Sequence, residues 1–245
     1  MYMIEYSELV VMKFKNIPKA LALIPDGNRR WARNNQMSFL KGYELGVSKF
    51  IDFSEWCNSY GVNNISVWAF SSENIKRPKE ELNALFRIYD KAAEDKDLIS
   101  RLHENKIRFK VVGDTSLLPK TLVSKLRVIE KQTGVYGRKV INMLIGYGGK
   151  EDILYAAKKL AKKSIDKGRV VVNENAFRSE LMSNAIPDID FLIRTSGEER
   201  LSGFMPWQTS YSELYFSEKL WPDFMKADLS KALLAFDARQ RRFGV

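Results

Sequence analysis

An aspartate, a compact turn and two arginines come directly after a short apolar run. The run Ala20–Ile24 stops at Pro25, and the next residues are Asp26, Gly27, Asn28, Arg29, Arg30 and Trp31. A helix that begins here presents free backbone N–H groups and a partial positive charge, which attract an anion. The carboxylate of Asp26 can hold a divalent cation against that anion. The stretch therefore predicts a site for a metal ion and a diphosphate.

A purely structural role is the alternative for this stretch, because Asp26 or Asn28 can cap a helix without binding a ligand. The two arginines favour binding, since cations at the positive end of a helix dipole repel it unless an anion arrives. No Gly-Lys-Ser or Gly-Lys-Thr follows, and no Gly-x-Gly-x-x-Gly turn occurs. A Walker A loop and a dinucleotide-binding turn are therefore excluded.

A second polar segment lies between an apolar run, 68–70, and a long amphipathic stretch. It contains Ser71, Ser72, Glu73, Asn74 and Arg77. Hydroxyl, amide and guanidinium groups suit phosphate oxygens, and Asn74 is a candidate for orienting a reacting group. Because helix capping explains the same residues, this segment favours binding only in combination with the first one.

A third segment, 194–202, supplies two arginines and a serine close to a turn. It contains Arg194, Glu198, Glu199, Arg200, Leu201 and Ser202. The arginines suit a second diphosphate, whereas surface ion pairs with the two glutamates are the alternative. Further on, Glu213 stands among aromatic residues. A buried carboxylate there needs a metal, an arginine or hydrogen bonds, so metal ligation and a structural ion pair both stay open.

Composition limits the class of protein. A chain of 245 residues with 45% hydrophobic residues buries a full core and is most simply one domain. The only cysteine, Cys57, and the only histidine, His103, exclude an internal disulfide, a Cys/His zinc cluster and a histidine-based triad. Cys57 is expected in the core and His103 at the surface. No apolar run approaches the twenty or so residues that span a bilayer, so we expect a soluble, cytoplasmic protein.

The net charge of +10 predicts an anionic partner. Nucleic acid, a membrane surface and a phosphorylated small molecule all fit the charge alone. No recognisable RNA- or DNA-binding motif occurs, and arginines placed after strands suit compact anions better. A nucleic-acid-binding protein is therefore the less favoured interpretation.

Six apolar runs have the character of strands, with amphipathic helical patterns between them. The expected strands cover 20–24, 65–70, 107–112, 140–145, 191–193 and 214–216. The expected helices cover 43–60, 79–105, 119–132, 151–163, 174–183 and 228–240. This alternation predicts an α/β fold in a single domain, with a largely parallel central sheet of about six strands flanked by helices.

In such sheets, ligands bind beyond the carboxyl ends of the strands. The segments that follow five of the strands, 25–30, 71–77, 113–115, 146–149 and 194–202, are rich in Gly, Ser, Asn, Asp and Arg. We expect them to meet at one edge of the sheet. The apolar faces of the helices after Tyr43 and after Lys79 would then line a slot for a hydrocarbon tail beside two diphosphate sites.

In their order along the chain, these motifs resemble those of the cis-prenyltransferases, also called Z-polyprenyl or undecaprenyl diphosphate synthases. The matching segments are 25–32, 70–74 with 77–78, 113–114, 147–149, 193–198, Trp207, 212–216, 221–224 and the terminal Arg242-Phe243-Gly244. Each is weak alone, whereas the ordered set is specific. The resemblance runs from about Leu21 to Gly244, which implies an N-terminal extension of residues 1–20 and a catalytic domain of residues 21–245.

The resemblance implies an enzyme that condenses successive isopentenyl diphosphates onto an allylic diphosphate, with Mg²⁺ as cofactor. The starter would be farnesyl or geranylgeranyl diphosphate, and the product a long-chain Z-polyprenyl diphosphate, precursor of a glycosyl carrier lipid. A short-chain Z-prenyl diphosphate is the alternative product. An apolar tunnel for the growing chain, a homodimer and peripheral contact with a membrane are further expectations.

Roles for single residues follow from the same resemblance. Asp26 would hold Mg²⁺ and assist departure of the allylic diphosphate, and Glu213 would complete the metal site. Asn74 is the family's assigned proton acceptor; because a neutral amide is a poor base, we expect it to orient a proton route. The residues that would bind the allylic diphosphate are Gly27, Asn28, Arg29, Arg30, Trp31, Ser71, Ser72, Glu73 and Arg77. Binding of isopentenyl diphosphate falls to Arg194, Arg200, Leu201 and Ser202, with Arg242 and Gly244 closing over it from the partner chain.

The chain departs from the family's pattern at several positions. Phe39 and Tyr43 stand where many members have a basic residue and the His of Gly-His, and Ile75 stands where Trp is common. Ser196-Gly197 replaces the usual Gly-Gly. These changes are compatible with activity and bear on the preferred starter.

Two alternative kinds of protein are less favoured. A trans-prenyltransferase uses the same substrates on an all-helical frame with Asp-rich DDxxD motifs, and this chain has no such motif. A non-catalytic partner subunit of the same fold loses the Asp-Gly-Asn loop, which is present here. We therefore expect a catalytic chain that works as a homodimer.

Overall fold

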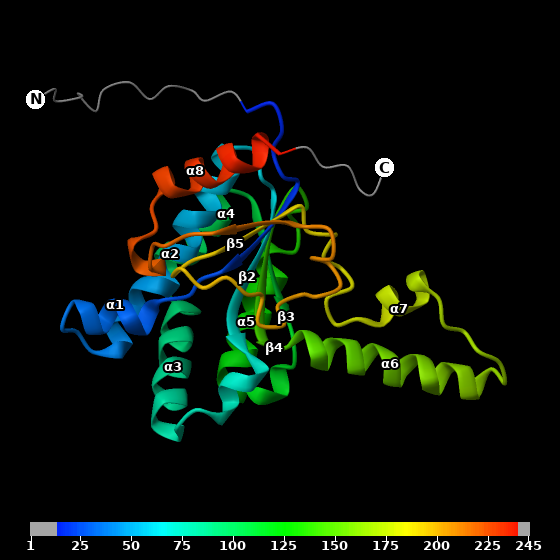
Figure 1. Cartoon of the computed structure of the whole chain (residues 1–245). Helices are drawn as coiled ribbons and strands as arrows, with labels where there is room; N and C mark the ends of the chain where they lie inside the picture. Colours follow the sequence, from blue (N-terminus) through cyan, green and yellow to red (C-terminus); the bar gives the residue numbers. More distant parts are fainter. Residues whose placement is uncertain (1–13, 240–245) are drawn as a thin grey trace, which may run out of the picture.

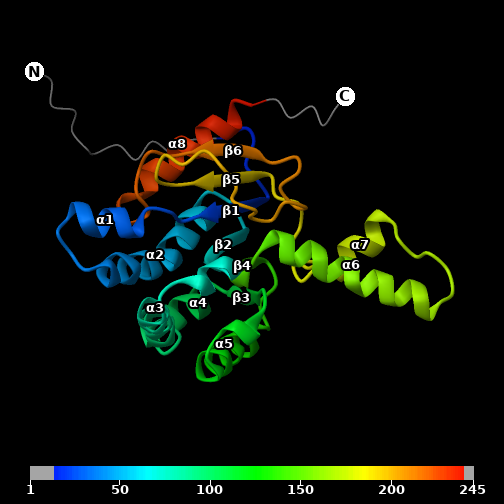
Figure 2. The same cartoon turned by 60° about the horizontal axis from the view of Figure 1, so that its bottom comes forward.

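The computed structural model describes residues 14–239, and six strands in that range form one sheet. They are β1 (Ala20–Ile24), β2 (Asn64–Ser71), β3 (Ile107–Val112), β4 (Lys139–Tyr147), β5 (Phe191–Arg194) and β6 (Glu213–Phe216). Their order is β3-β4-β2-β1-β5-β6, and every pairing is parallel (Figure 2). The predicted single-domain α/β fold with a largely parallel sheet of about six strands is confirmed.

Eight α-helices connect or follow these strands within the described residues. They are α1 (Asn28–Asn34), α2 (Phe39–Ser59), α3 (Lys79–Ala92), α4 (Lys96–Glu104), α5 (Lys120–Thr133), α6 (Gly149–Asp166), α7 (Glu174–Glu180) and α8 (Lys226–Asp237). Three short 3₁₀ helices, η1 (Ser72–Lys76), η2 (Thr115–Leu117) and η3 (Trp221–Asp223), complete the connections. No helix of the described part is both long and apolar enough to cross a membrane.

The helix expected over 79–105 is in fact two helices, and this prediction was wrong. Asp95 stands between α3 and α4 in an extended conformation, and its Oδ1 accepts hydrogen bonds from the backbone N–H groups of Asp97 and Leu98, at 2.9 and 3.3 Å. An aspartate in this position satisfies the free donors of a new helix start. The amphipathic pattern continues through the break because both helices pack on the same core.

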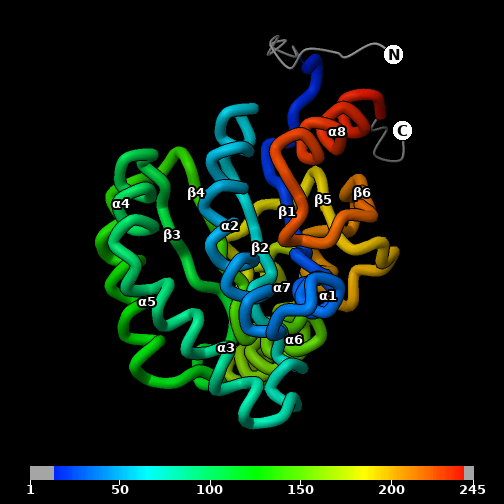
Figure 3. Tube along the Cα trace, turned by 90° about the vertical axis from the view of Figure 1, so that its left-hand side faces the viewer, coloured from blue at the N-terminus to red at the C-terminus, as the bar shows by residue number. Residues whose placement is uncertain are grey.

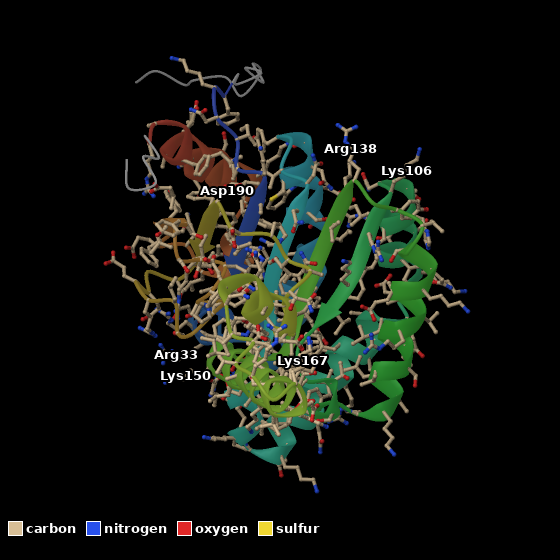
Figure 4. The ribbon with its side chains drawn as sticks, turned by 90° about the vertical axis from the view of Figure 1, so that its right-hand side faces the viewer. Arg33, Lys106, Arg138, Lys150, Lys167 and Asp190 are labelled. Carbon is tan, nitrogen blue, oxygen red and sulfur yellow. The ribbon has the colours of Figure 1, made fainter. Side chains whose placement is uncertain are left out.

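All strands begin at one edge of the sheet and end at the other. Lys106, Arg138 and Asp190 immediately precede β3, β4 and β5, and Figure 4 shows them at the same edge. Arg33 in α1 and Lys150 in α6, which follow β1 and β4, lie towards the opposite edge. The segments that follow the strands are therefore gathered on one side, as the parallel arrangement requires.

Alternate residues of the strands face two different cores. Leu21 and Leu23 of β1 pack with the helices α2 and α8, whereas Ala22 and Ile24 pack with the segment that follows α7. A third core joins α2, α3, α4 and α5 to β2, β3 and β4, and these helices cover the face seen in Figure 3. Helices α6 and α7 project to one side of the sheet (Figures 1 and 2). Cys57 is fully buried in the first core, as expected.

Candidate active site

The ends of two neighbouring strands bring a carboxylate and a guanidinium together. Ile24 of β1 pairs with Arg194 of β5, and Asp26 follows β1 by two residues. Arg194 Nη2 donates to Asp26 Oδ2 at 2.9 Å. The Arg194 side chain is 5% exposed and that of Asp26 is 34% exposed, so the carboxylate is the accessible member of this ion pair.

The loop that carries Asp26 is held by contacts on several sides. Asp26 Oδ1 accepts from the Gly27 N–H at 2.7 Å. The backbone carbonyl of Asp26 accepts from the Thr195 hydroxyl at 2.7 Å and from the Trp221 N–H at 3.0 Å. Gly27 has φ +105°, and a Cβ there would lie 2.9 Å from Leu220 Cδ2. Only glycine fits this turn without strain, and the turn starts α1 beside Asp26.

The consecutive arginines of α1 are paired with two different carboxylates. Arg30 donates to Glu198 Oε1 at 2.9 Å, and Arg200 contacts Glu198 Oε2. Arg29 Nη1 lies 3.5 Å from Glu81 Oε1, and Arg77 donates to the same oxygen at 3.3 Å. Each glutamate is therefore paired with two arginines. Each set of one glutamate and two arginines keeps a net positive charge, which attracts anions.

The serine and asparagine of the second polar segment form a helix cap. Ser71 Oγ accepts from the Asn74 N–H at 3.2 Å, and Asn74 Oδ1 lies 3.4 Å from the Ser71 nitrogen, which donates to it. The capping interpretation therefore holds for these two residues. Both also line the pocket described next, so the cap fixes them at its wall.

A polar pocket of about 310 Å³ joins the three predicted segments. The predicted site residues that line it are Asp26, Gly27, Asn28, Arg29, Arg30, Ser71, Asn74, Arg77, Arg194 and Ser202. The loops 113–115 and 146–149 do not line it; they contact each other, with the Asp114 N–H donating to the Gly146 carbonyl at 3.0 Å. Three of the five segments expected at this edge thus form one site.

An apolar cavity of about 110 Å³ shares part of its wall with the polar pocket. Val47, Phe50, Ala69 and Tyr89 line both. Beyond them the cavity is bounded by residues of α3, α4, α5, β3 and β4, almost all of them aliphatic or aromatic. A diphosphate in the polar pocket would therefore have an apolar space within reach of its hydrocarbon part.

Several predicted site residues lie outside the lining of the pocket. These are Trp31, Ser72, Glu73, Arg200, Leu201 and Glu213. Trp31 donates its indole N–H to Asp223 at 2.6 Å, and Leu201 packs on the core that contains Ala22 and Ile24. Arg200 is held through Glu198 to Arg30, which does line the pocket. Arg242 and Gly244 lie outside the described residues.

Glu213 is not close to Asp26 within one chain. It opens β6 and pairs with Phe191, which pairs with Leu21, five residues before Asp26. At about 3.3 Å per residue, that offset amounts to roughly 16 Å along the strands. Glu213 Oε2 instead accepts from Arg239 at 2.8 Å, so the ion pair left open by the sequence is the arrangement seen here.

The residues at the pocket suit a divalent cation that arrives with its substrate. The described residues hold no group of three or more His, Cys, Asp or Glu side chains that could bind a metal alone. Mg²⁺ commonly binds through one or two carboxylates together with phosphate oxygens of a substrate. Asp26, partly exposed beside the arginines, offers one such carboxylate.

Sequence reasoning missed the roles of Tyr43, Glu81 and Thr195. Glu81 stands four residues after Arg77 on the first turn of α3, a spacing that indicates an ion pair. Thr195 follows the last residue of β5, where its hydroxyl reaches the carbonyl of Asp26. Tyr43 carried no signal of contact with Arg77 because the two residues lie on elements far apart in the sequence.

Comparisons with known proteins show the family to which the chain belongs. The family model described as undecaprenyl diphosphate synthase matches residues 24–244. The chain is 38% identical to a tritrans,polycis-undecaprenyl-diphosphate synthase (geranylgeranyl-diphosphate specific) of Thermoplasma acidophilum, over 98% of this chain and 94% of that protein. It is 38% identical to a ditrans,polycis-undecaprenyl-diphosphate synthase ((2E,6E)-farnesyl-diphosphate specific) of Haemophilus influenzae, over 94% and 96%.

A solved structure shows the same fold. The crystal structure of lavandulyl diphosphate synthase from Lavandula x intermedia, in complex with dimethylallyl diphosphate, superposes with a TM-score of 0.88 and 33% identity, covering 93% of this chain and 98% of that one. Fold, site and sequence thus lead to one conclusion: the chain belongs to the undecaprenyl diphosphate synthase family of cis-prenyltransferases and is a prenyl-group transferase.

Proposed function

We propose that the protein is a Mg²⁺-dependent cis-prenyltransferase that adds isopentenyl diphosphate units to farnesyl or geranylgeranyl diphosphate. The product would be a long-chain Z-polyprenyl diphosphate, the precursor of a glycosyl carrier lipid. One observation carries the proposal: a pocket that joins Asp26 to several arginines shares its wall with an apolar cavity. A substrate with a diphosphate at one end and a hydrocarbon at the other fits both.

The chemistry requires stabilisation of negative charge as the allylic carbon–oxygen bond breaks. Arg29, Arg30 and Arg77 line the pocket and would stabilise the departing diphosphate through charge-assisted hydrogen bonds. When bound, Mg²⁺ would add Lewis-acid stabilisation at the same diphosphate, with Asp26 as its protein ligand. Arg194 and Ser202, on the β5 side of the pocket, would bind isopentenyl diphosphate.

The apolar wall has two roles in this proposal. Around the reacting carbon it excludes water, which would otherwise capture the allylic cation. Along the tail it favours elongation, because each buried methylene contributes about 0.8 kcal/mol. Asn74, held by Ser71, would orient the route by which the proton leaves the new double bond.

A short-chain product is the second candidate. The apolar cavity measures about 110 Å³ and is bounded on its helical side by residues of α4 and of the end of α3. A long product would therefore require α3 or α4 to move away from the sheet, so that the cavity becomes a tunnel. A short product would fit with less movement.

The remaining expectations belong to the same proposal. The distance from Glu213 to Asp26 within one chain means that a role for Glu213 at the metal would require a second copy, which agrees with the expected homodimer. A lipid product implies peripheral contact with a membrane from the cytoplasmic side. Sedimentation analysis of the purified protein tests the homodimer, and flotation with vesicles tests the contact with a membrane.

One assay tests the central proposal. The purified protein is incubated with Mg²⁺, labelled isopentenyl diphosphate and each allylic starter in turn, and the products are sized by chromatography. We expect incorporation that stops when the metal is chelated. A folded protein that incorporates no label with any starter would refute the enzymatic function.

A further inference from the structure

Tyr43 lies at the wall of the polar pocket, on the first turns of α2. Its ring is backed by Phe39 at 6.4 Å between ring centroids, in an edge-to-face arrangement. The two positions at which the chain departs from the family's pattern near this helix start therefore pack on each other. The phenol oxygen of Tyr43 is the only polar side-chain atom of this packed pair of rings.

The phenol of Tyr43 is bonded to Arg77. Arg77 Nη1 donates to Tyr43 Oη at 2.7 Å, and the guanidinium carbon lies 5.9 Å from the centre of the Tyr43 ring. The same nitrogen donates to Glu81 Oε1 at 3.3 Å. Two acceptors from two different helices thus fix the orientation of one guanidinium.

The other donors of Arg77 are available to a ligand. Within the described part of the chain, its Nε and Nη2 have no hydrogen-bond partner, and the residue lines the pocket. A guanidinium has five N–H donors in a rigid fork, so fixing one end sets the direction of the rest. The side chain is 25% exposed, which leaves it accessible to an anion.

We propose that Tyr43 is a positioning residue for the allylic diphosphate: it holds Arg77 in place and does not itself contact the ligand. This inference rests on the proposed function for the identity of the substrate. The effect of Tyr43 on Arg77 does not depend on which diphosphate is the substrate. Any diphosphate that binds at Arg77 gains affinity because the arginine is ordered before the ligand arrives.

The protonation state of the phenol supports this assignment. Burial raises the pKa of Tyr43 above its ordinary value, and the nearby Arg77 only partly opposes that shift. The phenol is therefore neutral throughout the physiological range. It accepts the bond from Arg77 without adding a charge that would repel a diphosphate.

The first variant, Tyr43→Phe, keeps the ring and removes only the hydroxyl. We expect the KM for the allylic diphosphate to rise about tenfold while kcat changes less than about threefold, since a hydrogen bond to a charged group is lost from binding. The affinity for inorganic pyrophosphate, measured by titration calorimetry, should fall by a similar factor. An unchanged KM and an unchanged pyrophosphate affinity would overturn the inference.

A double-mutant cycle tests whether Tyr43 acts through Arg77. In an Arg77→Met background, Tyr43→Phe should change kcat/KM and pyrophosphate affinity by less than about twofold. A full tenfold effect in that background would show that Tyr43 acts on the ligand directly. The calorimetric arm separates this inference from the proposed function: a tenfold loss of pyrophosphate binding upholds it even if no starter is elongated.

The chain offers a matched control on the same helix. Tyr60, at the other end of α2, also has a cation over its ring, with Lys226 Nζ 5.5 Å from the ring centre, but it does not line the pocket. Tyr60→Phe should leave KM and pyrophosphate affinity unchanged. If both variants raise KM equally, the effect belongs to the packing of α2 and not to Arg77.

Discussion

Asp26 Oδ2 and Arg194 Nη2 lie 2.9 Å apart at the carboxyl ends of the neighbouring strands β1 and β5. Arg194 also donates to Ser202 Oγ at 2.9 Å and contacts the carbonyl of Arg200. One buried guanidinium therefore joins the loop proposed for the allylic diphosphate to the loop proposed for isopentenyl diphosphate. A change at either residue should affect both loops.

Asp26→Asn tests the carboxylate itself. Arg194 and the Gly27 N–H donate to different oxygens of Asp26, so the single amide oxygen of asparagine can keep only one of these two bonds. The Thr195 hydroxyl and the Trp221 N–H still hold the loop through the Asp26 carbonyl, whereas the negative charge that would hold Mg²⁺ is lost. We expect kcat to fall roughly a hundredfold to a thousandfold, the usual scale for one electrostatic contact in a transition state. Steady-state incorporation of labelled isopentenyl diphosphate measures this.

Asp95→Asn is the control for that variant, because Asp95 only caps α4 and asparagine caps a helix equally well. Its activity should equal that of the unchanged protein. An Asp26→Asn variant that keeps more than about a tenth of the activity would contradict the proposed role of the carboxylate.

Arg194→Lys tests the connection between the two loops. A single ammonium group cannot reach Asp26, Ser202 and the Arg200 carbonyl together as the guanidinium fork does. We expect the KM for isopentenyl diphosphate to rise at least tenfold and the free energy of unfolding to fall by about 1–3 kcal/mol, measured in urea. Arg127→Lys, in an exposed pair with Glu130, should change stability by less than about 1 kcal/mol.

Much of the site could be predicted because local patterns and the parallel sheet act together. Asp26 and Arg194 each follow an apolar run, and parallel strands end at the same edge, so their proximity was predictable without a structure. The same reasoning placed Asn74 and Arg77 at this edge. The contact of each residue with a particular partner depended on loop conformation, which the patterns do not encode.

The positions that sequence reasoning could not place depend on register and packing. The distance of Glu213 from Asp26 follows from its pairing with Phe191, and nothing in the sequence fixes that register. The break between α3 and α4 is a capping event at Asp95 inside a continuous amphipathic pattern, so periodicity alone hides it. The bond between Tyr43 and Arg77 joins two elements whose approach only the packed structure defines.

Gly42→Ala tests the close approach of α1 and α2. A Cβ at Gly42 would lie 2.3 Å from the backbone oxygen of Asn28, which cannot move without shifting the start of α1. Alanine would add up to about 1 kcal/mol of helix propensity, whereas overpacking costs about 1–3 kcal/mol, so we expect a net loss of stability. Because α1 carries Arg29 and Arg30, kcat/KM should fall about tenfold or more.

Gly137→Ala is the matched control, since no atom other than those of Gly137 and its two chain neighbours lies within 4 Å of a Cβ at that position. Thermal unfolding and incorporation assays of the two variants should therefore diverge. If Gly42→Ala unfolds at the same temperature as the unchanged protein and keeps full activity, the contact between the two helices does not position the arginines.

Product length tests whether the apolar cavity accepts the growing chain. Ala93 and Leu102 line this cavity and lie on its helical side, at the end of α3 and within α4. Ala93→Leu reduces its volume and should shorten the product, at a cost in stability of about 1–3 kcal/mol. Leu102→Ala enlarges it and should lengthen the product, at a cost of about 2–5 kcal/mol. Ala227→Leu, at an exposed position of α8, should leave the length unchanged.

The two cavity variants both destabilise the protein but change the volume of the cavity in opposite directions. Loss of stability alone would therefore change the length of both products in the same direction. Opposite shifts in chain length, read by chromatography of the dephosphorylated products, therefore identify the cavity as the site of the hydrocarbon chain, and identical shifts exclude it.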